Sequence, residues 1–438
     1  RIPAGDPVEG IGTTILIAPG RLGRTAVPNY MEHRHGTADA PIVIRAAAGR
    51  GSVTIAPLNV FDVHHLYLVD LRIDAPSGDG FHCERCDHVL LRRVTVRGRD
   101  PGSWRIGDLV KVNQSSSIFI EGSDLSGASD NALDLVAVTY ASVRRTRIHD
   151  AMDWCAYAKG GSAYVRIVAD EIYDCGTGGF TAGQGTGFQF MEPPFLHYEA
   201  YDVVVTDSLI HDVEGAGLGV NGGYAILFAH NTLTRVGSRS HLMEFVAGGR
   251  SCDGVPGDDG RDRCARYLDL GGWGTTRVDD GTNAVRIPNR HVYVVRNLVV
   301  NRTDRMVGWQ HLEVAGPYGG AAQNGSNAPD PARFDDDLRF IGTLIWSGPA
   351  DEPLGIGDET GCAGARSTCA PDRIRAENRV NVVAVRLADR SLRIVAPDDL
   401  RGDGGPIPTV DWSDAPAGIP RGGAWTAAER DRDGLLRP

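Results

Sequence analysis

Short runs of alternating apolar and polar residues recur along this chain, each followed by a small turn and a second short apolar run. Such alternation predicts β-strands with one buried face. Each pair of runs with its turn forms one repeat unit. The last apolar residues of successive repeat units are Ile73, Val96, Leu125, Ile148, Ile172, Ile210 and Leu233. Their spacings of 23, 29, 23, 24, 38 and 23 residues indicate a base period of 23 to 24, with insertions in two turns.

This period fits three short strands and three turns in each coil of a solenoid. Leucine-rich repeats share the period, but their Leu/Asn signature is missing, and so is the six-residue rhythm of a left-handed β-helix. We therefore predict an all-β fold, a right-handed parallel β-helix. Residues 1–360 are expected to form the solenoid with its N-terminal cap and loop insertions, and residues 361–438 irregular C-terminal coils and a tail of the same domain.

Two segments near the N-terminus have a familiar pattern. The stretch TTILIAPGRLG and the segment from Gly36 to Ile55 resemble the opening coils of the pectate-lyase-like superfamily of secreted β-helix proteins. The ending from Asp431 to Pro438 resembles the usual closing segment of that superfamily. The resemblance implies the same fold and an extracellular setting.

The composition narrows the possible partners. The formal net charge is −11 and no basic cluster stands out, so we do not expect nucleic-acid binding. No window of about 18 apolar residues occurs, so membrane insertion is not expected either. We expect a secreted or periplasmic monomer, and the start at Arg1 is typical of a processed chain.

The 8 cysteines fall into close pairs. Cys252 and Cys264 bracket one loop, Cys362 and Cys369 bracket another, Cys155 and Cys175 lie about one coil apart, and Cys83 and Cys86 form a CxxC. Short loops closed by cysteine pairs favour disulfides in an oxidising compartment. Free thiols and a zinc site are the alternatives, but a four-cysteine zinc site normally has two CxxC halves and only one is present.

Outward side chains of one strand should stack in columns along a parallel β-helix, where a polymeric substrate can lie. When the coil ends are aligned on the repeat, the polar residues that fall in these outward columns are Lys111, Asn113, Asp134, Lys159, Gln184, Asn221 and Glu244. We predict substrate binding by Asn221, Gln184, Glu244, Lys111 and Trp273.

Lysine usage is the most informative chemical clue. Lys111 and Lys159 are the only lysines among 45 basic residues. A lysine supplies what arginine cannot, a compact amine that can lose its proton. Lys159 lies in AKGG, where glycines let a ligand approach the backbone, so we predict Lys159 as a catalytic base. An ordinary surface lysine is the alternative.

An acidic cluster precedes Lys159 in two successive turns. Its oxygen donors are Asp130, Asn131, Asp134, Asp150 and Asp153. Oxygen ligands from stacked turns suit Ca²⁺, so we predict a calcium site at these residues. Ordinary turn chemistry is the alternative, since Asp and Asn are common turn residues.

A lysine base beside calcium suits β-elimination of a uronic-acid polysaccharide, in which the metal holds the substrate carboxylate and lysine removes the adjacent C5 proton. The centre of the chain resembles two families of calcium-dependent β-helix lyases that use lysine. These are the chondroitinase B and alginate lyase family and the lysine-base pectate lyases. Lys159 matches the lysine of the first family. Gly160 stands where that family has serine, and Gly183, Gln184 and Gly185 stand at its Arg-His-Gly position.

A second group of candidates follows in the loops. His197, Tyr198, Arg239 and His241 are candidates for the catalytic acid or for substrate subsites, because loops carry binding residues disproportionately. Trp273 and Trp309 could stack on sugar rings. Packing of loops onto the solenoid is the alternative for each of them.

Two other functions stay open. A glycoside hydrolase could use Asp134 with Asp153 as its carboxylate pair, although the motifs of polygalacturonases do not occur together and Asp258-Asp259 stands without the rest. The Asp-Pro-His-Asp motif of β-helix epimerases is absent. A non-catalytic carbohydrate-binding or surface protein is the third possibility, because fold does not fix function. An enzyme is favoured if Lys159 lies open beside the acidic turns rather than paired with one aspartate.

Overall fold

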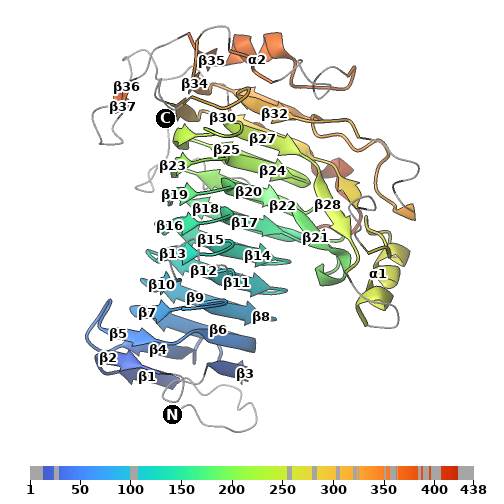
Figure 1. The fold of residues 1–438 in the computed structure, drawn as a ribbon. Coiled ribbons are helices and arrows are strands. Elements are labelled where there is room, and N and C mark those ends of the chain that lie inside the picture. The colour runs from blue at the N-terminus through green and yellow to red at the C-terminus, as the bar shows by residue number, and fades with distance from the viewer. Residues whose placement is uncertain are drawn as a thin grey trace.

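The computed structural model describes residues 13–23, 29–98, 107–253, 259–278, 284–301, 306–318, 323, 325–349, 352–355, 362, 364–382, 386–387, 394–395 and 406–422. Its strands stack coil upon coil into an elongated solenoid whose colour runs in order from the N-terminal to the C-terminal end (Figure 1). The predicted all-β parallel β-helix is therefore confirmed.

Each coil contributes one strand to each of three parallel rows. The first row contains β1 (Thr13–Ile17), β4 (Ile42–Ala46), β6 (Leu58–Val69), β9 (Asp87–Arg92), β12 (Ser116–Glu121), β15 (Thr139–Arg144), β18 (Ser162–Val168), β22 (Ala200–Thr206), β25 (Gly223–Ala229), β30 (Arg290–Val295) and β33 (Leu338–Ile341). The second row contains β3 (Tyr30–His35), β8 (Phe81–Glu84), β11 (Val110–Asn113), β14 (Leu133–Val136), β17 (Trp154–Lys159), β20 (Gly178–Gly183), β24 (Ala216–Asn221), β27 (Met243–Val246) and β32 (Leu312–Val314). The long strand β6 belongs to both rows, so together they form one 20-stranded sheet.

The third row is a separate 12-stranded sheet. It contains β2 (Gly20–Leu22), β5 (Val53–Ile55), β7 (Leu71–Asp74), β10 (Thr95–Arg97), β13 (Asp124–Ala128), β16 (Arg147–Ala151), β19 (Glu171–Cys175), β23 (Leu209–Val213), β26 (Thr232–Val236), β31 (Leu298–Val300), β34 (Leu344–Trp346) and β35 (Arg379–Val380). The residues that set the sequence period are direct register partners here, from Ile73 opposite Val96 through to Ile210 opposite Leu233. The repeat read from the sequence is thus the coil of the solenoid.

Apolar side chains fill the space between the rows. One inward column of the second row runs from Phe81 through Val110, Leu133 and Ala156 to Phe180, and all five are buried. Each coil can bury these side chains only against its neighbours, which is why the repeat must stack to be stable.

Buried polar side chains cap the backbone at the bend between the first and third rows. Each accepts a hydrogen bond from the backbone N–H one coil below: Thr146 N–H donates to Asp170 Oδ1 (2.7 Å), Ser208 N–H to Asn231 Oδ1 (3.0 Å) and Asn231 N–H to Asn297 Oδ1 (3.0 Å). Backbone groups at bends cannot join the strand ladders, so such an internal ladder satisfies donors that would otherwise be buried without a partner.

Loop insertions lie beside the second row. Strands β21 (Gly185–Gly187), β28 (Gly248–Ser251) and β29 (Val285–Ile287) form a small sheet, and helix α1 (Asp259–Asp269) stands next to it (Figure 1). Toward the C-terminus, helix α2 (Pro371–Glu377) precedes β35, and β36 (Arg386–Leu387) pairs with β37 (Ile394–Val395). The predicted closing segment from Asp431 to Pro438 lies outside the described residues, and the domain division at residue 360 stays a prediction.

All four predicted cysteine pairs form disulfides, namely Cys83–Cys86, Cys155–Cys175, Cys252–Cys264 and Cys362–Cys369. The disulfide prediction is confirmed. Among the described residues, no helix has the length and apolar character needed to cross a membrane.

Candidate functional site

Outward side chains of the second row form two columns along the solenoid. One column contains His82, Lys111, Asp134, Tyr157, Thr181, Gly219, Glu244 and Glu313. The other contains Glu84, Asn113, Val136, Lys159, Gly183, Asn221 and Val246. The candidates aligned from the coil ends therefore share one face, built from strands β8 to β32 (Figure 1).

Lys111 is held between two carboxylates. Its Nζ lies 2.6 Å from Asp108 Oδ2 and 3.0 Å from Asp134 Oδ2. Burial alone would oppose the charge of Lys111, but Asp134 and Asp108 raise its pKa above the ordinary value. Lys111 is therefore a fixed cation and a poor base.

One positive charge cannot keep two adjacent carboxylates ionised equally. Burial alone would raise the pKa of Asp108, but Lys111 and a hydrogen bond from Asn131 lower it. Burial and the Asp108 charge raise the pKa of Asp134 to about 7. Asp108 is thus the ionised partner of Lys111, and Asp134 can take up a proton near neutral pH.

Lys159 has a different environment. Its Nζ donates a hydrogen bond to Gln184 Oε1 at 2.9 Å and lies 4.3 Å from the centre of the Tyr157 ring. Within the described part of the chain, Lys159 forms no ion pair with a carboxylate, although the coil below carries Asp130 and Asp134. Lys159 is therefore held by an amide oxygen and an aromatic face, whereas Lys111 is held by two carboxylates.

The turn after Lys159 is shaped by two glycines and a buried ion pair. Gly160 and Gly161 have φ of +66° and +84°, and a Cβ on Gly161 would lie 2.3 Å from the Phe195 carbonyl oxygen. The fully buried Glu199 accepts from Gly160 N–H at 3.0 Å, and Arg250 Nη2 lies 2.5 Å from Glu199 Oε1. This ion pair fixes the backbone that carries Lys159.

Glu199 and Arg250 were not among the residues predicted from the sequence. The signal that could have found Glu199 is the 38-residue step, because the insertion that causes it contains this residue. An acidic residue in an insertion that lies next to the turn of a candidate base is itself a candidate for holding that turn in place.

Polar contacts continue along the face toward the C-terminal coils. Thr181 Oγ1 donates to Asn221 Oδ1 at 2.8 Å, and His241 Nε2 lies 2.9 Å from Glu313 Oε2. Burial and the Glu313 charge raise the pKa of Glu244 to about 7. The predicted residues Asn221, Glu244 and His241 therefore lie on the same face as Lys159, several coils further along.

Two other candidates lie at the edge of this face. Arg239 is exposed and pairs with Glu214 at 2.6 Å. Trp309 is 63% exposed and contacts the His241 ring edge-on, with ring centres 5.2 Å apart. An exposed aromatic ring beside polar groups is suited to stack on a sugar ring.

His197, Tyr198 and Trp273 form a cluster of their own. Tyr198 is 5% exposed and packs on Tyr201, which covers the outward face of the first row, and on Trp273. Burial and the Arg250 charge lower the pKa of His197 to about 4. These side chains pack the insertion onto the solenoid, and the structure shows no contact between them and Lys159.

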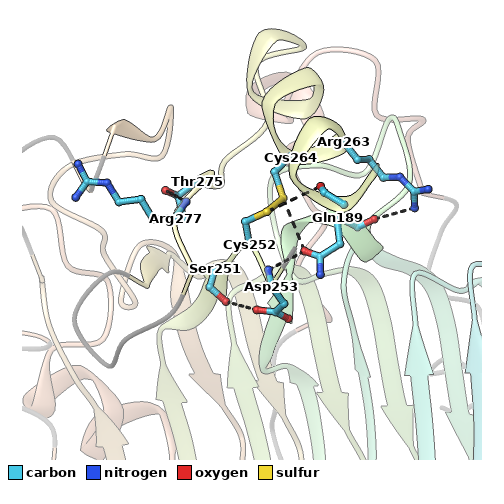
Figure 2. The surroundings of a disulfide bond; sticks show 9 residues. Gln189, Ser251, Cys252, Asp253, Arg263, Cys264, Thr275 and Arg277 are labelled. Atoms are coloured by element: carbon cyan, nitrogen blue, oxygen red, sulfur yellow. Dashed lines mark hydrogen bonds between the residues drawn. A yellow bond between two sulfur atoms is a disulfide. The ribbon is translucent and has the colours of Figure 1, made fainter. Parts of the chain in front are cut away.

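The Cys252–Cys264 disulfide ties α1 to the end of β28 at the border of the face (Figure 2). Gln189 lies beneath it. Its Oε1 accepts from Asp253 N–H at 3.1 Å, and its backbone oxygen accepts from Arg263 Nη1 at 3.1 Å. The disulfide and these hydrogen bonds fix the insertion that contains α1 beside the second row.

The residues predicted for calcium do not converge on one point. Asp150 is a residue of β16 in the third row and binds His149 Nδ1 at 2.7 Å. In the part of the chain that the structure describes, no three carboxylates of the set have oxygens within 4.8 Å of one another. The Lys111 ammonium also lies between Asp108 and Asp134, where a cation would have to bind. The donor set does not fit a calcium cage.

Two open hollows lie over the third row instead. One includes Arg21 and Asp74, and the other Asp212 and Arg235. In each hollow the arginine is ion-paired with the aspartate. Such paired carboxylates are poor candidates for acid and base, and the second row remains the better candidate. Asp258, weighed for a hydrolase, lies outside the described residues.

Residues 79–248 match the family model "Right handed beta helix region". The chain is a right-handed parallel β-helix protein. This confirms the fold that its resemblance to the pectate-lyase-like superfamily implied. A comparison with curated proteins finds none that matches the sequence of this β-helix.

Solved structures similar to this β-helix include enzymes and an adhesin. The A-module of mannuronan C-5 epimerase AlgE6 from Azotobacter vinelandii has 14% identity and a TM-score of 0.44, covering 76% of this chain and 85% of that one. The PL6 family polysaccharide lyase Pedsa3628 from Pseudopedobacter saltans has 11% identity and a TM-score of 0.40, covering 86% and 91%. PfbA, a surface adhesin of Streptococcus pneumoniae, has 9% identity and a TM-score of 0.45, covering 77% and 79%.

Proposed function

We propose that this β-helix protein is an extracellular or periplasmic polysaccharide lyase that cleaves a uronic-acid polysaccharide by β-elimination, with Lys159 as the base. The observation that carries the proposal is the contrast between the two lysines. Lys111 is fixed between carboxylates, whereas the contacts of Lys159 among the described residues are an amide oxygen and an aromatic ring on the same face. The disulfides favour an oxidising compartment.

The proposed β-elimination uses Lys159 and the outward columns of the second row. The polymer lies along the outward columns, and neutral Lys159 removes the proton from C5 of a uronate. The C4–O4 bond then breaks, a C4=C5 double bond forms, and O4 takes a proton from water or a nearby acid. The amides of Gln184 and Asn221 and the ring of Trp309 provide sugar contacts along the face.

The test is the absorbance of unsaturated uronate during incubation with alginate, pectate and glycosaminoglycan, with Ca²⁺ and with chelator. Growth of the signal supports β-elimination, and its persistence in chelator excludes a required calcium ion. New reducing ends without absorbance would overturn the lyase in favour of a hydrolase. No product from any polymer would favour a binding or surface protein.

The two raised carboxyl pKa values predict how substrate binding depends on pH. Asp134 and Glu244 both have a pKa of about 7, so each is mostly neutral at pH 6 and charged at pH 8. Each added negative charge opposes a polyanion by about 1 kcal/mol, or about fivefold in affinity. We expect the Kd of an inactive Lys159→Arg protein, which keeps a positive charge near Asp134, for a uronate oligosaccharide to rise about 10-fold or more from pH 6 to pH 8.

Calorimetric titration at the two pH values measures this change, and the double variant Asp134→Asn/Glu244→Gln is the matched control. Asn and Gln keep an oxygen acceptor but carry no charge, so the control should bind nearly equally at both pH values. An unchanged pH dependence in the double variant would show that other groups cause it.

A further inference from the structure

A group of histidines lies on the first coils, well before the candidate active face begins in sequence. His35 of β3 is the register partner of His64 of β6, and Asp62 of β6 lies beside them. His35 Nε2 is 3.2 Å and His64 Nε2 is 3.4 Å from the same atom, Asp62 Oδ1. The three potential ligand atoms lie within 4.8 Å of one another.

These spacings are those of ligands around one small metal ion. Zinc binds imidazole nitrogen and carboxylate oxygen at about 2.0–2.2 Å in tetrahedral geometry, which places neighbouring ligand atoms about 3.3 Å apart. The two distances to Asp62 Oδ1 agree with this value. Two histidines and one carboxylate with open positions are a ligand set for divalent transition metals.

The environment of His35 Nε2 is a second indication. This atom is shielded from solvent, and Asp62 Oδ1 faces it at 3.2 Å without the geometry of a hydrogen bond. A shielded polar atom without a partner is costly. A metal ion between this nitrogen and the carboxylate oxygen would remove that cost for both.

His33 has the position of an orienting residue. Its Nδ1 lies 2.7 Å from Asp62 Oδ2, the oxygen that does not face His35 and His64. A hydrogen bond to the second carboxylate oxygen fixes the first one as a single ligand, as outer partners do in known metal sites.

Ordinary ion pairing explains the group less well. The rings of His35 and His64 are stacked, with centres 4.0 Å apart and planes 11° from parallel. Protonating both would place two positive charges face to face beside one carboxylate. A metal ion is bound by neutral imidazoles and needs no such protonation.

We propose that His35, His64 and Asp62 bind one divalent transition-metal ion, with Zn²⁺ as the expected occupant, and that His33 orients Asp62. The ion joins β3 to β6 and so ties the first coil to the second. Terminal coils of a solenoid lack a neighbour on one side and need such added stabilisation. The proposal concerns the N-terminal end and is independent of the lyase activity.

A second histidine group supplies the matched control. His65, Asp87 and His88 also gather within 4.8 Å. Both oxygens of Asp87 are already engaged, one by Ser116 Oγ and one by His88 Nδ1 at 2.5 Å. We therefore expect this second group to bind Zn²⁺ weakly.

The experiment is Zn²⁺ titration of the full chain, without a histidine tag, by calorimetry and by elemental analysis after dialysis. We expect one tightly bound ion in the parent and in His88→Gln, and at least a 100-fold weaker Kd in His64→Gln and in Asp62→Asn. Zn²⁺ should also raise the thermal midpoint of the parent and His88→Gln but of neither site variant. Circular dichroism without metal checks that all four proteins are folded.

Three results would overturn the proposal. They are the absence of Zn²⁺ binding below millimolar concentration in the parent, the parent affinity in both His64→Gln and Asp62→Asn, and loss of the ion in His88→Gln alone. None of these measurements uses polysaccharide, so their outcome is separate from that of the lyase test.

Discussion

Replacing Lys159 by alanine is expected to lower kcat about 1000-fold on the polysaccharide that the parent cleaves. Loss of a positioned general base typically costs 10² to 10⁴ in rate. Lys159→Arg should lose about as much, because a guanidinium does not give up its proton at accessible pH. KM should change little in comparison, since Gln184, Asn221 and the rest of the face stay in place. Initial rates of unsaturated-uronate absorbance measure both constants.

The matched control is the same substitution at the other lysine. In Lys111→Arg, a cation remains between Asp108 and Asp134, so we expect activity within about 10-fold of the parent. The pair of arginine variants separates the need for a removable proton from the need for positive charge. If Lys159→Arg kept most of the parent kcat, Lys159 would not be the base.

Most of the fold could be predicted because one coil repeats one physical pattern. The last apolar residue of each repeat unit must point inward in every coil, so the spacing between these residues equals the coil length. The structure pairs Ile148 with Ile172 across 24 residues and Ile172 with Ile210 across 38, as the period and its insertion predict. Insertions change the spacing but leave the register intact.

The face could be predicted, but the environment of each residue on it could not. Lys111 and Lys159 both follow apolar strand residues and look alike in sequence. Whether a lysine reaches a carboxylate depends on side chains one coil away, such as Asp134 beside Lys111 and Gln184 beside Lys159. A period known to within one residue does not resolve that difference.

The predicted calcium site also depended on positions in space that the sequence does not specify. Asp150 and Asp153 are three residues apart, yet Asp150 belongs to β16 of the third row and Asp153 lies in the turn before β17. Oxygen ligands must meet within a few ångströms to hold one ion. Residues on different sides of a bend do not do so, and the sequence alone did not locate the bend.

The histidine group was missed although the sequence contains its signal. His35 and His64 are 29 residues apart, the same spacing as Val96 and Leu125 in the repeat. A coil with an insertion of the same length would place them side by side, whereas the base period of 23 to 24 residues does not. Such pairs are hard to recognise in the irregular first coils, because no complete repeat unit precedes Leu66 and sets the period there.

Arg250→Ala is expected to lower the free energy of unfolding by about 4 kcal/mol, the largest stability effect of any single change considered. Removing one partner of a buried ion pair typically costs 3–5 kcal/mol, because the other charge stays buried and unpaired. Here the partner is Glu199, and both side chains are 0% exposed. Arg250 Nη1 also donates to the carbonyl oxygens of His197 (2.7 Å) and Trp273 (2.5 Å), which would lose their donor.

Two comparisons identify the cause of that loss in urea or guanidinium unfolding. The double variant Glu199→Gln/Arg250→Met removes both charges and should unfold at a higher denaturant concentration than Arg250→Ala. Arg239→Ala breaks the exposed pair with Glu214 and should cost less than about 1 kcal/mol. A similar loss in Arg239→Ala and Arg250→Ala would show that burial does not set the cost.

Arg250→Ala also tests whether the buried ion pair fixes the position of Lys159. Glu199 accepts from the backbone N–H of Gly160, the residue directly after the proposed base, so the orientation of Glu199 fixes the position of Lys159. Arg250→Ala should therefore lower kcat even at temperatures where the protein is still folded, with much less effect on substrate affinity. An unchanged kcat in folded Arg250→Ala would mean that Gly160 and Gly161 alone hold the turn, and the ion pair would then serve stability only.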